Sequence, residues 1–194
     1  MTSTFATALA GLFLFSSFTG SGVPDKGQSP KELAYPTIVV SMTGYNAVAE
    51  QTDGDPHTTA SGAFSNPEVV AARSVDLKET LPFGTVIEVI GTDSTSPNCG
   101  LSAVEEHLGY RVIADSMHSR KRNQIDILLD NEPSVKAAGR FVNPAVALGV
   151  CKEVEIRVIG KLDIKEMPKT QRELRARMAS LELANNQPLA LKKF

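Results

Sequence analysis

The sequence contains no tryptophan, only two cysteines and few aromatic residues, which make up 6% of the chain. This scarcity argues against an extensive aromatic platform for sugar stacking, although Tyr45, Phe64, Phe83 and Tyr110 remain available. The three histidines and two cysteines show no metal-ligand spacing, so we expect no metal site. A net charge of −2 gives no indication of nucleic-acid binding.

The chain also lacks an apolar run of the roughly 20 residues that a membrane-spanning helix needs. Its N-terminal apolar segment, residues 8–15, has the length of a signal-peptide core and is followed by small residues. No Lys or Arg precedes the segment and no Ala-x-Ala site follows it, so a short anchor or a buried N-terminal helix stays open. We expect a signal peptide or short anchor over residues 1–22 and a linker over 23–36.

An exported protein would fold in an oxidising compartment, where Cys99 and Cys151 allow a single disulfide. Whether the two cysteines pair stays open at this stage. The expected location is the cell envelope or the extracellular space, with membrane association only through the N-terminus.

The middle of the chain consists of short β-type runs separated by turn residues. The spacing and alternation of apolar residues predict six strands, over residues 37–43, 69–73, 85–90, 110–114, 125–129 and 154–159. Residues 133–138 are interpreted as one helical turn or more. Six short strands must close on themselves or form two packed sheets to avoid bare edges, so we expect an all-β fold.

The end of the chain, residues 161–194, changes character and is rich in good helix formers. Leu174, Met178 and Leu181 fall on one face of an amphipathic helix. The helix would dock on the barrel or pair with a partner, and a partly frayed tail is the alternative.

Two aspartates, Asp115 and Asp126, lie eleven residues apart at the edges of two predicted strands. The polar loop between them folds back, so both carboxyls are expected to meet at one end of a small sheet. Two acids beside a basic loop are candidates for acid/base work on a sugar or ester bond. The alternative is structural, with Asp115 as a turn residue and Asp126 as a strand cap.

Four further blocks accompany the aspartates in order and spacing. They read Thr43-Gly-Tyr45, Thr58-Thr-Ala-Ser-Gly62, Val70-Ala-Ala-Arg73 and Leu81-Pro-Phe-Gly-Thr85. With the pair Asp115 and Asp126, the chain resembles the 3D-domain family, named for three aspartates. It is similar in particular to small exported bacterial 3D-domain proteins and to the catalytic domain of membrane-bound lytic transglycosylases of the A type. The resemblance covers residues 37–160.

The resemblance implies a six-stranded double-psi β-barrel, here with a C-terminal α-helical tail. It also implies cleavage of peptidoglycan strands at the β-1,4 bond between N-acetylmuramic acid and N-acetylglucosamine, without a cofactor. The product ends in a 1,6-anhydro ring, so water is not the nucleophile. By this resemblance Asp126 is the general acid/base and Asp115 tunes or orients it. Residues implied to bind substrate are Lys121, Thr59, Ser61, Gly62 and Tyr45.

The charges near the acid have opposing effects on its pKa. A nearby carboxylate such as Asp115 raises the pKa of Asp126 by repulsion, which keeps a proton available at neutral pH. Arg120, Lys121 and Arg122 favour the ionised form instead, and the sequence does not decide between the two effects. These basic residues could also bind the carboxylates of the muramic lactyl group or of the peptide stem.

Several positions depart from the family pattern. The loop usually reads Thr-Gly-Gly after the middle aspartate, whereas residues 116–118 are Ser-Met-His, and Arg122 replaces a glycine. Asp76 is the nearest match to the first aspartate of the family but stands out of register, so it is not assigned a catalytic role. Asp53 and Asp55 are interpreted as turn residues.

Two other functions stay open. The first is a non-catalytic barrel that binds peptidoglycan or another polysaccharide. The second is a structural module that docks a partner through its C-terminal helix.

Overall fold

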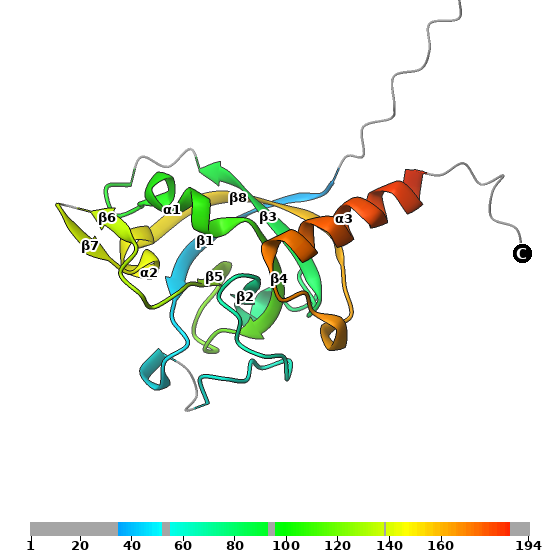
Figure 1. The fold of residues 1–194 in the computed structure, drawn as a ribbon, viewed down its shortest axis with the longest axis horizontal. Helices are drawn as coiled ribbons and strands as arrows, with labels where there is room; N and C mark the ends of the chain where they lie inside the picture. The colour runs from blue at the N-terminus through cyan, green and yellow to red at the C-terminus, as the bar shows by residue number, and fades with distance from the viewer. Residues whose placement is uncertain (1–34, 52–54, 93–95, 138, 187–194) are drawn as a thin grey trace, which may run out of the picture. The chain divides into compact units, whose positions relative to one another are not determined.

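The computed structural model describes residues 35–51, 55–92, 96–137 and 139–186 (Figure 1), and all of these fall in one unit of the chain. The signal peptide or anchor expected over residues 1–22 lies outside the described residues, as does the linker apart from its last two positions. Across the described residues, no helix is long and apolar enough to cross a membrane.

Six strands form a closed barrel in the order β1-β5-β2-β4-β3-β8. Each of the six predicted strands is present, so the all-β barrel is confirmed. The strands are β1 (Thr37–Tyr45), β2 (Val70–Arg73), β3 (Thr85–Thr92), β4 (Tyr110–Ser116), β5 (Gln124–Leu128) and β8 (Val150–Lys161). Closure pairs β8 with both β1 and β3, so none of these six strands is left with a bare edge.

The order of the strands follows from two parallel pairs. Strand β1 runs parallel to β5, and β2 runs parallel to β4, whereas the remaining pairs are antiparallel. Parallel neighbours require crossover connections, so the chain passes over itself twice, as in the expected double-psi barrel. As a result β2 lies between β4 and β5, the two strands that carry the paired aspartates.

Side chains alternate along the strands between two apolar clusters. One cluster receives side chains from all six strands and fills the barrel: Met42, Ala71, Ile87, Ile113, Ile125 and Ile156 are among them. The other lies on the opposite face of the strands and contains Val70, Val112 and Leu128. The β-branched residues Val and Ile suit this pleated, two-sided burial.

Arg111 is a charged side chain inside this fold, with only 1% of its surface exposed. Its guanidinium donates hydrogen bonds to the backbone carbonyls of His107, Leu108, Pro67 and Leu128. The first two carbonyls belong to the last turn of α1 (Leu101–Leu108), where carbonyl groups lack helical partners and carry partial negative charge. Carbonyl dipoles therefore contact the buried cation directly, and the charge of Glu68 also favours its charged form.

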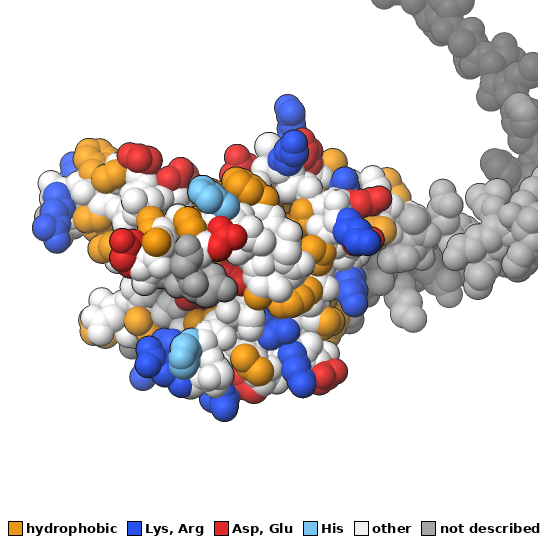
Figure 2. All heavy atoms as spheres, turned by 90° about the horizontal axis from the view of Figure 1, so that it is seen from below, with side chains coloured by type: hydrophobic (Ala, Val, Ile, Leu, Met, Phe, Trp, Pro, Cys, Tyr) orange, Lys and Arg blue, Asp and Glu red, His pale blue; other side chains and the backbone are white. Residues whose placement is uncertain are grey.

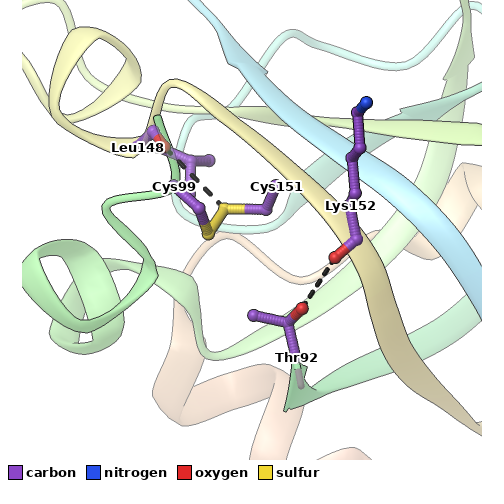
Figure 3. The surroundings of a disulfide bond; sticks show 5 residues. All are labelled: Thr92, Cys99, Leu148, Cys151 and Lys152. Carbon is purple, nitrogen blue, oxygen red and sulfur yellow. Dashed lines mark hydrogen bonds between the residues drawn. A yellow bond between two sulfur atoms is a disulfide. The ribbon is translucent and has the colours of Figure 1, made fainter. Parts of the chain in front are cut away.

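A disulfide joins Cys99 to Cys151, 52 residues further along the chain (Figure 3). The sequence left this pairing open. It ties the segment before α1 to the start of β8, where Thr92 donates a hydrogen bond of 2.6 Å to the Lys152 carbonyl.

The helical turn predicted over 133–138 is wrong. Residues Val135–Ala137 form strand β6, which pairs with β7 (Arg140–Val142) through a turn at Gly139, whose φ of 81° suits glycine. Helix α2 (Pro144–Leu148) follows directly, and Asn143 caps it by accepting a hydrogen bond of 2.9 Å from the Val146 amide.

The C-terminal tail expected over residues 161–194 forms helix α3 (Gln171–Asn186), so its first ten residues are not part of the helix. Pro168 disfavours helix in the residue before it, and Ile164–Glu166 form a separate 3₁₀ turn. Leu174 and Met178 are buried against the outer apolar cluster, whereas Leu181 lies at the edge and is 39% exposed. The helix is therefore docked.

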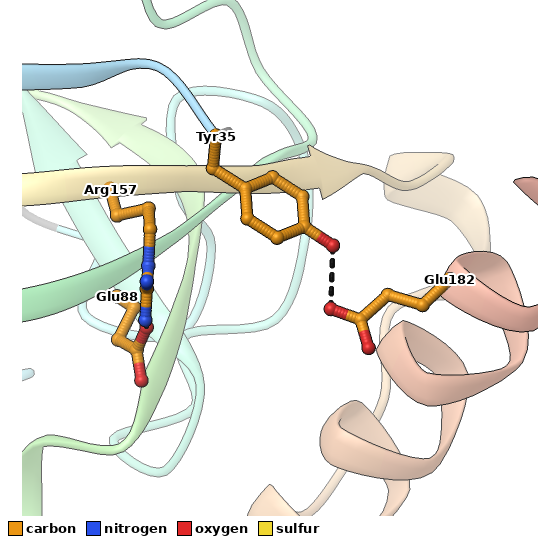
Figure 4. A network of polar contacts seen from close by, with 4 residues as sticks. All are labelled: Tyr35, Glu88, Arg157 and Glu182. Atoms are coloured by element: carbon orange, nitrogen blue, oxygen red, sulfur yellow. Dashed lines mark hydrogen bonds and ion pairs between the residues drawn. The ribbon is translucent and has the colours of Figure 1, made fainter. Parts of the chain in front are cut away.

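Polar contacts fix both ends of α3. At its start the Gln171 side chain accepts a hydrogen bond of 3.0 Å from the Tyr110 amide and donates one of 2.7 Å to the Tyr110 carbonyl. Near its end Glu182 accepts a hydrogen bond of 2.5 Å from the Tyr35 hydroxyl, beside the ion pair of Arg157 with Glu88 (Figure 4).

Docking of α3 predicts unequal effects of two identical substitutions in the helix. Leu174→Ala should lower the free energy of unfolding by about 3 kcal/mol, because the side chain is fully buried. Leu183→Ala is the matched control and should change it by less than about 0.5 kcal/mol, because Leu183 is 70% exposed. Urea unfolding followed by circular dichroism measures both values. Equal effects would contradict docking.

Candidate active site

A hollow of about 380 Å³ lies where β1, β2, β4 and β5 come together. It is lined by four of the residues that the resemblance implicated, namely Asp115, Asp126, Lys121 and Tyr45. The 55–66 segment borders it (cyan in Figure 1), and Figure 2 views the molecule from that side. Acidic, basic and hydrophobic side chains are interspersed on this face, with no large patch of one sign.

The two aspartates stand in one row across four strands. Thr43 on β1 is in register with Asp126 on β5, and Asp126 is in register with Ala72 on β2. Ala72 is in turn in register with Asp115 on β4. The two acids therefore flank a methyl group, which leaves the space between them open as part of the hollow.

Asp115 accepts three hydrogen bonds from the protein. The Tyr45 hydroxyl donates to Oδ2 at 2.9 Å, and the amides of Ala60 and Ser116 donate to Oδ1 at 2.9 Å and 2.8 Å. Both carboxylate oxygens are therefore engaged, and the 58–62 segment is tied to β4. Asp115 is placed to orient its surroundings.

Asp126 has a simpler environment. The Thr43 hydroxyl donates a hydrogen bond of 2.8 Å to Oδ1, and the Gln124 amide donates one of 2.8 Å to the Thr43 oxygen. Because the amide nitrogen of Gln124 can only donate, the Thr43 proton is directed at Asp126. Among the described residues no other side chain or amide donates to Asp126, which leaves Oδ2 to hold a transferable proton.

Burial raises the pKa of Asp126 to about 6. The hydrogen bond from Thr43 and the charge of Lys121 lower it, and the charge of Asp115 adds a smaller increase. Burial therefore changes the pKa of Asp126 more than the repulsion from Asp115 or the charge of the basic loop, the two effects that the sequence indicated. A pKa near 6 leaves both protonation states accessible close to neutral pH.

The small-residue stretch is placed differently from the expected groove lining. Thr59 is buried, and its hydroxyl lies 3.1 Å from that of Ser61 in a contact that holds the loop. The neighbouring residues Thr58 and Ala60 line the hollow instead. Gly62 takes a φ of 83° at the turn and lies outside this hollow.

The basic loop divides in a similar way. Lys121 lines the hollow, whereas Arg122 donates to the carbonyls of Ser119 and Lys121 and so holds its own loop. Arg120 is exposed. Substrate binding by Lys121 stays a prediction, and the position of its side chain agrees with it.

The remaining aspartates lie outside the hollow or beyond the described residues. Asp76 accepts a hydrogen bond of 2.9 Å from the Asn123 amide, and Asp55 accepts one of 2.9 Å from the His57 amide. The Asp55 contact lies within a turn, in line with the interpretation from sequence, whereas the Asp76 contact joins two segments that are 47 residues apart. Asp53 lies outside the described residues.

Sequence reasoning missed several residues of the site. Ala72, Met117 and His118 also line the hollow, and Gln124 supports Thr43. Thr43 could have been found, because it lies two positions before Tyr45 on one strand and therefore on the same face. His118 lies in the loop between the two aspartates, but no sequence signal assigned its side chain to the site.

Comparison with known proteins finds no matching family model and no matching curated protein. Within the described residues no group of three His, Cys, Asp or Glu side chains is placed to hold a metal ion. Among the described residues, the groups placed for chemistry at this site are therefore the side chains that surround the hollow.

The raised pKa of Asp126 predicts a stability effect that depends on pH. Between about pH 4 and pH 6 the folded protein binds more protons than the unfolded chain, so stability falls as pH rises. Asp126→Asn removes this loss. At pH 8 the free energy of unfolding of the variant should exceed that of the natural protein by roughly 1–2 kcal/mol, a value reduced for the partial exposure of Asp126. At pH 4 the difference should be much smaller.

Urea unfolding at a series of pH values measures the difference between the two proteins. Glu155→Gln, which removes an exposed carboxylate from β8, is the control for the loss of one carboxylate elsewhere on the barrel. A constant difference for Asp126→Asn would show that Asp126 titrates like an exposed aspartate.

Proposed function

We propose that this protein is an exported peptidoglycan-cleaving lytic transglycosylase with Asp126 as its single acid/base. The observation that carries the proposal is the contrast between the two aspartates. Asp126 combines a raised pKa with a carboxylate oxygen left free of hydrogen bonds from the described residues. Both oxygens of Asp115 are held by protein donors, which leaves it poorly suited to attack a sugar or to activate water.

The proposed reaction uses Asp126 twice. Protonated Asp126 donates its proton to the glycosidic oxygen between N-acetylmuramic acid and N-acetylglucosamine as the bond from that oxygen to C1 breaks. The 6-hydroxyl of the muramic residue then attacks C1, and ionised Asp126 accepts the hydroxyl proton. The products are a free 4-hydroxyl and a 1,6-anhydro end, and no water is consumed.

The surrounding residues support this cycle. Thr43 stabilises the ionised form that follows the first proton transfer, and the charge of Lys121 acts in the same direction. Ala72 leaves space for a sugar ring between the acids. Met117 and His118 line the hollow at positions where the family usually has glycines. The shape of substrate that fits here is therefore expected to differ from that of the family.

The disulfide supports the proposed location. Disulfides persist in oxidising compartments and are rare in the cytosol, so the bond between Cys99 and Cys151 agrees with export to the cell envelope or beyond. That compartment is also where peptidoglycan strands are accessible.

A digest of purified peptidoglycan by the full chain, read by mass spectrometry, tests the proposal. We expect fragments with 1,6-anhydro ends, and a rate at least about a hundredfold lower for Asp126→Asn, because the acid is lost. Asp130→Asn is the matched control, since Asp130 follows β5 but lies outside the hollow, and it should retain the rate of the natural protein.

Other outcomes would redirect the proposal. Fragments with reducing ends would indicate hydrolysis, with a second group activating water. Absence of cleavage by the natural protein, together with co-sedimentation with peptidoglycan, would replace the enzyme by the wall-binding barrel.

A further inference from the structure

A second hollow, of about 620 Å³, lies on the other side of the segment that borders the active-site hollow. One wall is formed by Gly62, Ala63, Phe64 and Asn66, and the other by Ile164, Lys165, Met167, Pro168 and Lys169. The first wall belongs to the same stretch whose Thr58, Ala60 and Ser65 face the aspartates. One stretch of chain thus separates two hollows.

Both walls are held in place by the fold. Thr58 and Phe64 form an antiparallel bridge, which fixes the shape of the shared stretch. The Asn66 side chain donates a hydrogen bond of 2.7 Å to the Lys169 carbonyl and so joins the two walls directly. The start of α3 anchors the second wall, because Gln171 is bonded to β4.

The second hollow combines exposed apolar surface with positive charge. Phe64 is 69% exposed, and the half-buried Met167 adds apolar surface from the opposite wall. Lys165 and Lys169 are exposed and line the same hollow, and neither forms an ion pair with a carboxylate of the described residues.

Carboxylates close to these lysines along the chain are already engaged elsewhere. Glu166 pairs with Arg177 at 3.8 Å, and Glu173 accepts a hydrogen bond of 2.8 Å from the Lys169 amide. Asp163 accepts one of 2.9 Å from the Lys165 amide. Glu68, which is distant along the chain, accepts one of 3.1 Å from the Gln171 amide. The two ammonium groups therefore remain available to an anionic ligand.

We infer that the second hollow binds the carboxylate-bearing peptide stem of the glycan strand whose sugars occupy the active-site hollow. This inference rests on the proposed function. A peptide stem carries carboxylates that complement the two lysines and aliphatic groups that suit Phe64 and Met167. The wall that supplies the lysines lies beyond residues 37–160, so this subsite is a feature of this chain's own tail.

Cleavage by the full chain of two substrates tests the inference. One is a set of glycan strands with intact peptide stems, and the other is the same strands after an amidase has removed the stems. The double variant Lys165→Gln/Lys169→Gln should lower the ratio of kcat/KM for intact over stripped strands about fivefold to tenfold. Raising the salt concentration should reduce the same ratio for the natural protein.

The control is Lys136→Gln/Lys152→Gln, which removes the same charge from exposed positions on β6 and β8 and should leave the ratio unchanged. An unchanged ratio in the Lys165 and Lys169 variant, with digestion still proceeding, would overturn the inference alone. An equal fall in the control pair would also overturn it, as a general effect of charge. Failure of the natural protein to cleave either substrate would contradict the proposed function and the inference with it.

Discussion

The buried guanidinium of Arg111 joins the two strands that carry the aspartates to each other and to α1. Arg111 lies on β4 four positions before Asp115, and it donates to the carbonyl of Leu128, two positions after Asp126 on β5. Since β2 separates these strands, the buried side chain joins two segments that share no backbone ladder. Removing it would leave four carbonyl groups without a donor, at a cost of about 1–3 kcal/mol for each group that stays buried.

Asp115 and Asp126 are chemically identical side chains, but the fold gives them different environments. Asp115 is surrounded by donors, whereas Asp126 is half-buried with one hydroxyl donor and a more distant lysine. Burial disfavours the ionised form of Asp126, and that same free-energy cost keeps a proton available for transfer. The proposed acid therefore carries a stability cost, as acids with raised pKa values in functional sites do.

The sequence predicted the parts of the fold that depend on local pattern. Alternating Val and Ile residues located the strands, and the spacing of Asp115 and Asp126 indicated a shared site. The place of Ala72 between the acids was not predicted, because the order of strands in a barrel depends on crossovers that leave no local signal. Burial of Asp126 was missed for the same reason. At 135–137 tertiary pairing with β7 decided the conformation, whereas the local pattern had indicated a helical turn.

Asp126 should hold a proton near neutral pH, and carbon-13 NMR of its carboxyl group in the full chain measures this. Comparison with Asp126→Asn assigns the signal. We expect a titration midpoint near 6, which moves upward in Thr43→Val because the hydrogen bond that favours ionisation is lost. A midpoint near the ordinary aspartate value of about 4, unchanged in Thr43→Val, would exclude Asp126 as the proton donor proposed above.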